Sequence, residues 1–163
     1  MKKRASKIDI NKIKVVHHKY GALGLRLFGL GPSWKPSQGL FKLKELFDKH
    51  SFWAKNRSLG QIKKMLLSSN VIISIWLEKK LIGFGRCTGD GIYRAVLWDI
   101  IVAQEFHRLG VGQEIINAIL STKFIKNTEK VYVMTSKRKD FYMKVGFQKN
   151  KQTLLLRNLR SIN

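Results

Sequence analysis

Residues 98–120 read WDIIVAQEFHRLGVGQEIINAIL and predict a strand that leads through a glycine-containing loop into a helix. The run Leu97–Val102 is apolar, rich in β-branched residues and interrupted only by Asp99, as expected of a buried strand. Further on, apolar residues recur at the spacing of a helix with one buried face; they are Ile115, Ile116, Ala118, Ile119 and Leu120. The first N–H groups of this helix have no intrahelical partner, and they point outward with the positive end of the helix dipole.

The loop before this helix is suited to binding a pyrophosphate. Gly110 and Gly112 carry no side chain that would keep a ligand away from the backbone N–H groups. The pattern alone is weak, because a tight turn that binds nothing has the same glycines. Two known phosphate-binding templates are excluded, since no Gly-Lys-Ser/Thr is present and Ile115 stands where Gly-x-Gly-x-x-Gly has its third glycine.

Two motifs resemble those of the GCN5-related N-acetyltransferases. The loop is similar to motif A, V-x-x-x-x-[QR]-x-x-G-x-[GA], with Val102, Gly110 and Gly112 in register; His107 departs from it at the Gln/Arg position. Residues 140–147 read DFYMKVGF and are similar to motif B, F-Y-x-x-x-G-F. The two motifs occur in the family's order with one strand-like segment between them, so the pair is more specific than either motif alone.

The resemblance covers residues 70–148 and is poor before residue 55 and after residue 148. The sequence GRCTGD at Gly85–Asp90 is most similar to sequences of the plastid and cyanobacterial branch of this family. Members of that branch acetylate protein lysines, N-termini or arylalkylamines such as serotonin. The resemblance implies an α+β fold: a mixed, mostly antiparallel sheet, splayed at its fourth and fifth strands, with flanking helices. It implies acetyl-CoA as the co-substrate, bound in the gap between those strands.

The resemblance also implies roles for individual residues. The backbone of the strand would pair with the pantetheine amides, and the loop N–H groups would hold the pyrophosphate. The residues implied in cofactor binding are Ile101, Val102, His107, Arg108, Leu109, Gly110, Val111, Gly112 and Gln113. No metal is expected, and the second substrate would be an amine on a protein or a small molecule.

Two residues are candidates for proton transfer. Tyr142 occupies the position of the family's general acid, and a phenol is a suitable donor to a thiolate of similar basicity; alternatively, it only packs with Phe141 and Phe147. Asp99 is the candidate base, because burial in an apolar run would raise its pKa. The alternatives for Asp99 are a structural acid that is hydrogen-bonded to the backbone or that offsets a nearby lysine. A water chain to solvent could also replace any dedicated base.

The chain of 163 residues, 44% of them hydrophobic, is expected to form one domain over 1–163, with an irregular region at 1–55. No apolar run reaches the roughly 20 residues of a membrane span, and the N-terminus lacks the apolar segment of a secretory signal. The single cysteine, Cys87, allows no intramolecular disulfide.

The formal net charge of +22 favours anionic partners. One alternative function is therefore a basic RNA- or ribosome-binding module, and another is a CoA-binding protein without turnover. However, the excess is mostly lysine spread along the chain beside many isoleucines and asparagines, as an AT-rich genome also produces. Together with the branch resemblance, this bias predicts the plastid stroma, or otherwise a bacterial cytoplasm.

The other elements are expected in chain order from local patterns. The strands are expected at Lys12–Lys19, Val71–Glu78, Leu81–Thr88, Tyr93–Val102 and Val131–Thr135, with closing strands around Phe147 and Thr153–Leu159. The helices are expected around Phe41–Phe47, over about 59–69 after the capping box Ser58–Gln61, and over 138–145. The segment Tyr20–Ser37 is expected to be a loop, either near the acceptor site or as an ill-packed N-terminal excursion. Five aromatic residues would line an acceptor pocket or, more often, the core: Trp34, Trp76, Phe84, Tyr93 and Trp98.

Overall fold

The computed structural model describes residues 12–18 and 38–157, and its centre is a five-stranded sheet with the order β1-β2-β3-β4-β5. The strands are β1 (Ile13–His18), β2 (Val71–Leu77), β3 (Lys80–Gly89), β4 (Arg94–Val102) and β5 (Lys130–Val133). Neighbouring strands are antiparallel from β1 to β4, whereas β4 and β5 are parallel. The mixed, mostly antiparallel sheet is confirmed.

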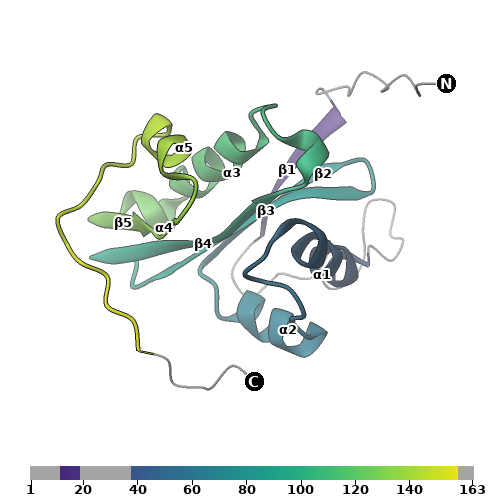
Figure 1. Cartoon of the computed structure of the whole chain (residues 1–163), viewed down its shortest axis with the longest axis horizontal. Helices are drawn as coiled ribbons and strands as arrows, with labels where there is room; N and C mark the ends of the chain where they lie inside the picture. Colours follow the sequence, from purple (N-terminus) through teal and green to yellow (C-terminus); the bar gives the residue numbers. More distant parts are fainter. Residues whose placement is uncertain (1–11, 19–37, 158–163) are drawn as a thin grey trace.

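The helices cover both faces of this sheet (Figure 1). They are α1 (Gly39–His50), α2 (Leu59–Leu67), the 3-10 turn η4 (Gln104–Phe106), α3 (Val111–Leu120), α4 (Lys123–Lys126) and α5 (Lys139–Lys144). Helices α1 and α2 lie against one face, and α3, α4 and α5 lie on the other side. Within the described residues, no helix has the length and apolar character to cross a membrane.

Alternation along β3 decides which side chains face which helices. Gly83 and Gly85 face α3: a Cβ on Gly85 would lie 2.4 Å from Cγ2 of Ile115, so the helix packs directly on the strand backbone. Phe84 and Arg86 therefore point to the α1/α2 face. There, the buried ring of Phe84 meets Phe47 of α1 edge to face at 5.6 Å.

Strand β4 separates from β5 after Leu97, where β5 ends. They pair only over Arg94–Leu97 and Lys130–Val133, while β4 continues to Val102. At the same place β4 carries an extra residue relative to β3, and Asp99 has a left-handed backbone with φ 51°. A bulge bends a strand locally, so the splay predicted at the fourth and fifth strands is confirmed.

Most of the predicted elements are confirmed, including the first strand, the meander and the helices. At the start of α2, the Ser58 hydroxyl accepts the N–H of Gln61 at 3.2 Å and the Gln61 side chain accepts the N–H of Ser58 at 2.9 Å, which completes the capping box. The predicted loop Tyr20–Ser37 lies outside the described residues.

The closing strand pair is wrong over the residues that the structure describes. The N–H of Phe147 donates to the carbonyl of Tyr142 at 3.0 Å, so its backbone completes the end of α5 instead of joining a strand. Residues 148–157 form no strand, and Leu154–Leu156 are exposed. Three successive leucines lack the alternation that would bury one face of a strand. Residues 158 and 159 lie outside the described part.

Candidate active site

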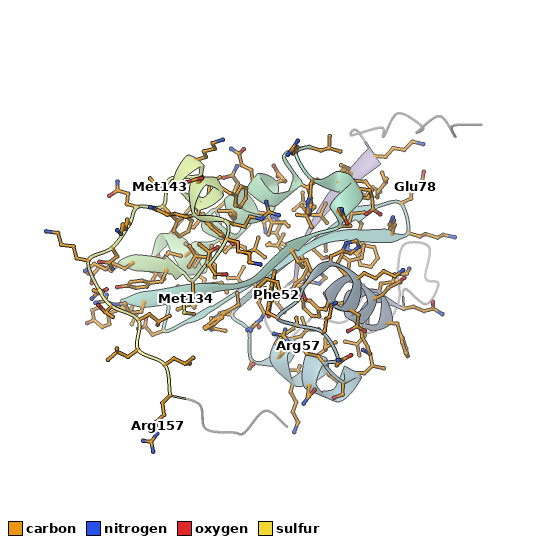
Figure 2. All side chains as sticks on the ribbon, in the orientation of Figure 1. Phe52, Arg57, Glu78, Met134, Met143 and Arg157 are labelled. Carbon is orange, nitrogen blue, oxygen red and sulfur yellow. The ribbon has the colours of Figure 1, made fainter. Side chains whose placement is uncertain are left out.

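A cleft of about 750 Å³ lies where β4 and β5 diverge. Its walls come from residues 50–57 between α1 and α2, Trp98–Val102 of β4, residues 133–138 after β5, and Tyr142 of α5. Figure 2 shows Phe52 and Arg57 on the segment between α1 and α2. The cleft thus joins segments from both helical layers.

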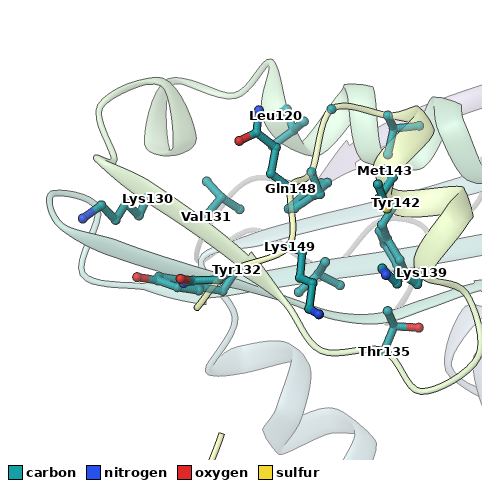
Figure 3. Close-up of a pocket in the computed structure, with 15 residues that line it drawn as sticks. Leu120, Lys130, Val131, Tyr132, Thr135, Lys139, Tyr142, Met143, Gln148 and Lys149 are labelled. Carbon is teal, nitrogen blue, oxygen red and sulfur yellow. The ribbon is translucent and has the colours of Figure 1, made fainter. Parts of the chain in front are cut away.

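A second cavity of about 720 Å³ lies along β5, and Tyr142 lines it as well (Figure 3). Val133 and Thr135 also belong to both cavities. The side chain of Tyr142 therefore stands at the boundary between the two hollows, next to the place where the parallel strands separate.

The β4 wall offers backbone groups to an extended ligand. Beyond Leu97, the edge of β4 that faces β5 has no strand partner among the described residues. Val102 presents its backbone groups there, whereas Ile101 pairs with Phe84 of β3 on the opposite edge. A polar ligand chain can pair with such an edge as an added strand does. However, the carbonyl of Val102 is already engaged, because Nε2 of His107 lies 2.9 Å from it.

This contact revises what His107 can offer to a phosphate. Toward a carbonyl, Nε2 must be the donor, and a neutral ring then has only an acceptor at Nδ1. A second donor, aimed at a phosphate, requires the protonated ring. Sequence reasoning did not foresee this contact between the two motif positions Val102 and His107.

The N-terminus of α3 fits a pyrophosphate. No side chain among the described residues caps it, so the N–H groups of Val111, Gly112 and Gln113 remain available. The cap residue Gly110 has φ 81°, and a Cβ there would meet nothing within 4 Å. The loop before it, with Arg108 and Leu109, is exposed.

The two motif positions require glycine for different reasons. Gly110 adopts the left-handed conformation that disfavours a side chain. A Cβ on Gly112 would lie 3.1 Å from Cζ of Phe141, so its missing side chain makes room for α5. The prediction that both glycines keep side chains away from a ligand fits Gly110, whereas Gly112 lets α5 approach α3.

Tyr142 packs and faces the cleft at once. Its ring meets Phe141 at 5.1 Å and Phe147 at 5.8 Å, both edge to face. Burial raises the pKa of the Tyr142 phenol, which therefore keeps its proton throughout the neutral range. The two alternatives for this residue, packing and proton donation, are compatible in one geometry.

Asp99 differs from the prediction. Its carboxylate lies 2.7 Å from Nε of Arg86 and 3.2 Å from Nη1 of Arg57, and it accepts the indole N–H of Trp53 at 3.3 Å. Burial alone would raise the pKa of Asp99, but the hydrogen bonds and charges of the two arginines outweigh it and lower the pKa. The expected upward shift is therefore wrong, and the geometry favours the alternative of an acid that offsets nearby cations.

Sequence reasoning missed several residues of the cleft. Arg86 stands within the otherwise uncharged run Leu81–Cys87, and this was the available signal, since it matches the isolated Asp99 on the next strand. Nothing in the sequence marked Arg57. Of the aromatic candidates, Trp98 lines the cleft, Trp76 and Phe84 are core, Tyr93 is exposed, and Trp34 lies outside the described residues.

No group of three or more His, Cys, Asp or Glu side chains that could hold a metal ion occurs in the described ranges.

Comparisons with known proteins agree with this arrangement. A family model, the acetyltransferase (GNAT) domain, matches residues 68–149. The uncharacterized N-acetyltransferase ycf52 of Pyropia yezoensis is 32% identical over 118 residues, 68% of this chain and 66% of that protein. Serotonin N-acetyltransferase 2, chloroplastic, of Oryza sativa is 26% identical over 113 residues, 64% of this chain and 54% of that protein.

Among solved structures, an aminoglycoside acetyltransferase, meta-AAC0020, from an uncultured soil metagenomic sample has the same fold. Its TM-score is 0.68 at 21% identity, over 95% of this chain and 100% of that chain. The aligned segment spans less than two thirds of the length of either curated relative. With the GNAT model covering half of the sequence, the chain belongs to the GNAT acetyltransferase family.

Proposed function

We propose that the protein moves an acetyl group from acetyl-CoA to a primary amine by direct attack within a ternary complex. The observation that carries the proposal is the position of Tyr142, which faces a cleft bounded by the open edge of β4 and by His107 of the loop that enters α3. One cleft thus brings together a proton donor and two features suited to a long, anionic thioester.

The geometry supports a set of binding roles within this proposal. The N–H groups of Val111, Gly112 and Gln113, with Gly110 leaving room, would hold the pyrophosphate at the positive end of α3. Arg108 and Leu109 would border it from the exposed loop, and the protonated ring of His107 would add a donor. The backbone N–H of Val102 would pair with the pantetheine portion, and Ile101 would support it as the neighbouring residue that pairs with β3.

The chemical step needs one proton donor. The amine nitrogen attacks the thioester carbonyl, the carbon–sulfur bond then breaks, and the thiolate takes the phenol proton of Tyr142. The amine proton leaves through water to solvent, because the lowered pKa of Asp99 makes that carboxylate a poor base. In this proposal Asp99 acts indirectly, by holding Arg57 and Arg86 in the cleft wall.

The acceptor and the location belong to the same proposal. The relatives include a serotonin N-acetyltransferase named as chloroplastic, which supports a primary amine acceptor and a plastid stroma. Protein lysines and N-termini are the other acceptors consistent with the branch. A bacterial cytoplasm is the alternative location.

Calorimetric titration with acetyl-CoA at two salt concentrations tests the cofactor, with adenosine 3′,5′-bisphosphate as the control for simple anion binding. We expect micromolar binding that exceeds the control and survives high salt. Weak, salt-sensitive binding equal to the control would refute the proposal and leave RNA as the ligand to examine. Acetyl-CoA binding without acetylation of any amine would indicate a binder without turnover.

A further inference from the structure

The cleft carries an excess of positive charge. Four cationic side chains line it, namely Arg57, Arg86, Lys137 and Arg138, against the single carboxylate of Asp99. That carboxylate is shared between two guanidinium groups. With its histidines neutral, the lining of the cleft therefore has a formal charge of +3.

Overall composition does not account for this cluster. The chain has 23 lysines and 9 arginines, yet three of the four cations in the cleft are arginines. The side chains of Arg86 and Arg57 are only 14% and 29% exposed, whereas most lysines of the chain lie on the surface. A partly buried cation that shares its counter-ion is costly unless a further anion completes the pair.

The arginines retain unused donors. Arg86 uses Nε for Asp99 and places Nη1 3.4 Å from the Ser69 hydroxyl; Nη1 of Arg57 lies 3.2 Å from the Asp99 carboxylate and also donates to Sδ of Met65 at 3.5 Å. Within the described residues, the remaining N–H groups of both arginines form no further hydrogen bond, and the side chain of Arg138 forms none. A guanidinium fork matches the two oxygens of a carboxylate or phosphate.

Arg57 and Arg86 lie away from the proposed phosphate site at α3. Because Gly85 faces α3, its neighbour Arg86 points to the opposite face of the sheet, where Arg57 meets it. Asp99 precedes Val102 by three residues on β4, a separation of about 10 Å along the strand. An anion held by the arginines is therefore distinct from the pyrophosphate of the cofactor.

We infer that the amine acceptor carries an anionic group, a carboxylate or a phosphate, which the paired guanidinium groups of Arg57 and Arg86 bind. This inference rests on the proposed acetyl transfer and adds the charge of its substrate. Phe52 and Trp53, which pack edge to face at 5.0 Å beside Arg57, provide an apolar wall for the rest of the molecule. The same charges repel polyamines and peptide tails rich in lysine.

Matched amines test the inference. Initial acetylation rates are measured for tryptamine against tryptophan and for ethanolamine against O-phosphoethanolamine, so that each pair differs by one anionic group. We expect kcat/KM to be about tenfold or more higher for the anionic member of at least one pair, since a hydrogen bond to a charged group contributes about 1.5–3 kcal/mol. The pair that responds distinguishes carboxylate from phosphate.

Variants assign the preference to the arginines. Arg57→Gln and Arg138→Gln should each lower the anionic-to-neutral ratio of kcat/KM, the former by about tenfold. Arg138 is exposed, so its replacement leaves the fold intact. Lys126→Gln on α4 removes one positive charge away from the cleft and should leave the ratio unchanged.

A binding measurement covers the case in which none of the four amines reacts. Acetate and inorganic phosphate are titrated into the protein saturated with CoA, and one of them should bind the wild type about tenfold more tightly than Arg57→Gln. Two results would overturn the inference and leave acetyl transfer standing. One is that neutral amines react as well as anionic ones; the other is that wild type and Arg57→Gln bind the anion equally tightly. Failure to bind acetyl-CoA at all would instead overturn the proposed function.

Discussion

At the scale of single residues, Asp99 combines a left-handed backbone with a carboxylate buried between two arginines. Its side chain is 5% exposed, and both Arg57 and Arg86 depend on it as a counter-ion. Asparagine tolerates positive φ as well as aspartate does, so Asp99→Asn changes the charge and keeps the backbone. The variant therefore isolates the electrostatic role of this residue.

We expect Asp99→Asn to lower the free energy of unfolding at neutral pH by about 3–5 kcal/mol, because it leaves two cations without their counter-ion. The pKa of Asp99 is lowered in the folded state from an unfolded value of about 3.9, so its stabilisation is present above pH 4 and is lost as the pH falls through the folded pKa.

Urea denaturation at several pH values measures this difference. The gap between wild type and variant should be complete at pH 7 and close below pH 4. The exposed pair Lys12–Glu78 provides the control, since Glu78→Gln should cost less than about 1 kcal/mol. A gap that stays constant down to pH 2 would show that the charge of Asp99 is irrelevant to stability.

Tyr142→Phe removes the phenol proton and keeps the ring contacts with Phe141 and Phe147. If Tyr142 protonates the thiolate, kcat should fall about 10- to 1000-fold with acetyl-CoA affinity retained. Burial raises the pKa of Tyr142, so wild-type activity should persist through mildly alkaline pH and fall only above about pH 10.

Steady-state kinetics and acetyl-CoA titration of Tyr142→Phe check this prediction. Tyr132→Phe is the matched control, because Tyr132 lies on β5 outside the cleft and its hydroxyl faces Gln152. Equal rates for wild type and Tyr142→Phe would remove the tyrosine from the mechanism.

Residue positions were predictable only where a local motif carried them. The position of Tyr142 beside the cleft follows from motif B at residues 141–147, and the glycine turn at Gly110 follows from motif A at residues 102–112. The partners of Asp99 did not follow, because Arg57 and Arg86 come from other elements and only the folded sheet brings them together. The sign of the pKa shift of Asp99 depended on those partners.

At the scale of elements, the contact between β3 and α3 sets the position of the α3 N-terminus, which is the proposed pyrophosphate site. Gly85→Ala would place a methyl group 2.4 Å from Cγ2 of Ile115 and 2.8 Å from Cδ1 of Ile100. We expect it to lower the free energy of unfolding by about 1–3 kcal/mol through overpacking, as measured by urea denaturation.

Gly60→Ala in α2 is the opposite case. The nearest atom to its added Cβ is the Ser58 hydroxyl oxygen at 3.9 Å, so the methyl group fits and should stabilise the helix by about 0.5–1 kcal/mol. If both alanine variants were equally stable, close packing of α3 on β3 would not contribute to the fold.

Elements were predictable where their signals are local and redundant. The capping box at Ser58 and the two-residue turn between β2 and β3 each mark their element within a few residues. The strands expected after Phe147 failed, because an unbroken leucine run satisfies several structures equally and only a neighbouring strand could select one.

At the scale of the whole molecule, the net charge of +22 predicts some binding to any polyanion. If this is a property of the surface alone, RNA affinity should fall steeply with salt, by about 10³-fold between roughly 50 and 200 mM for several phosphate contacts. Acetyl-CoA, held partly by uncharged backbone groups, should lose far less over the same range.

Fluorescence anisotropy with a single-stranded RNA, compared with acetyl-CoA titration in the same buffers, separates the two cases. RNA binding that survives 200 mM salt and prefers one sequence would contradict the view that the basic surface is nonspecific. In that event the RNA-binding alternative would outrank acetyl transfer.

The division of the cleft between the two faces of the sheet has an evolutionary consequence. The α3 cradle lies within residues 68–149, which match the family model, whereas Phe52, Trp53 and Arg57 precede them. Under the proposed function, changes in residues 51–57 would alter which amine is bound and leave the site for the acyl donor unchanged. Proteins descended from one ancestral gene could then accept different amines and still use the same coenzyme.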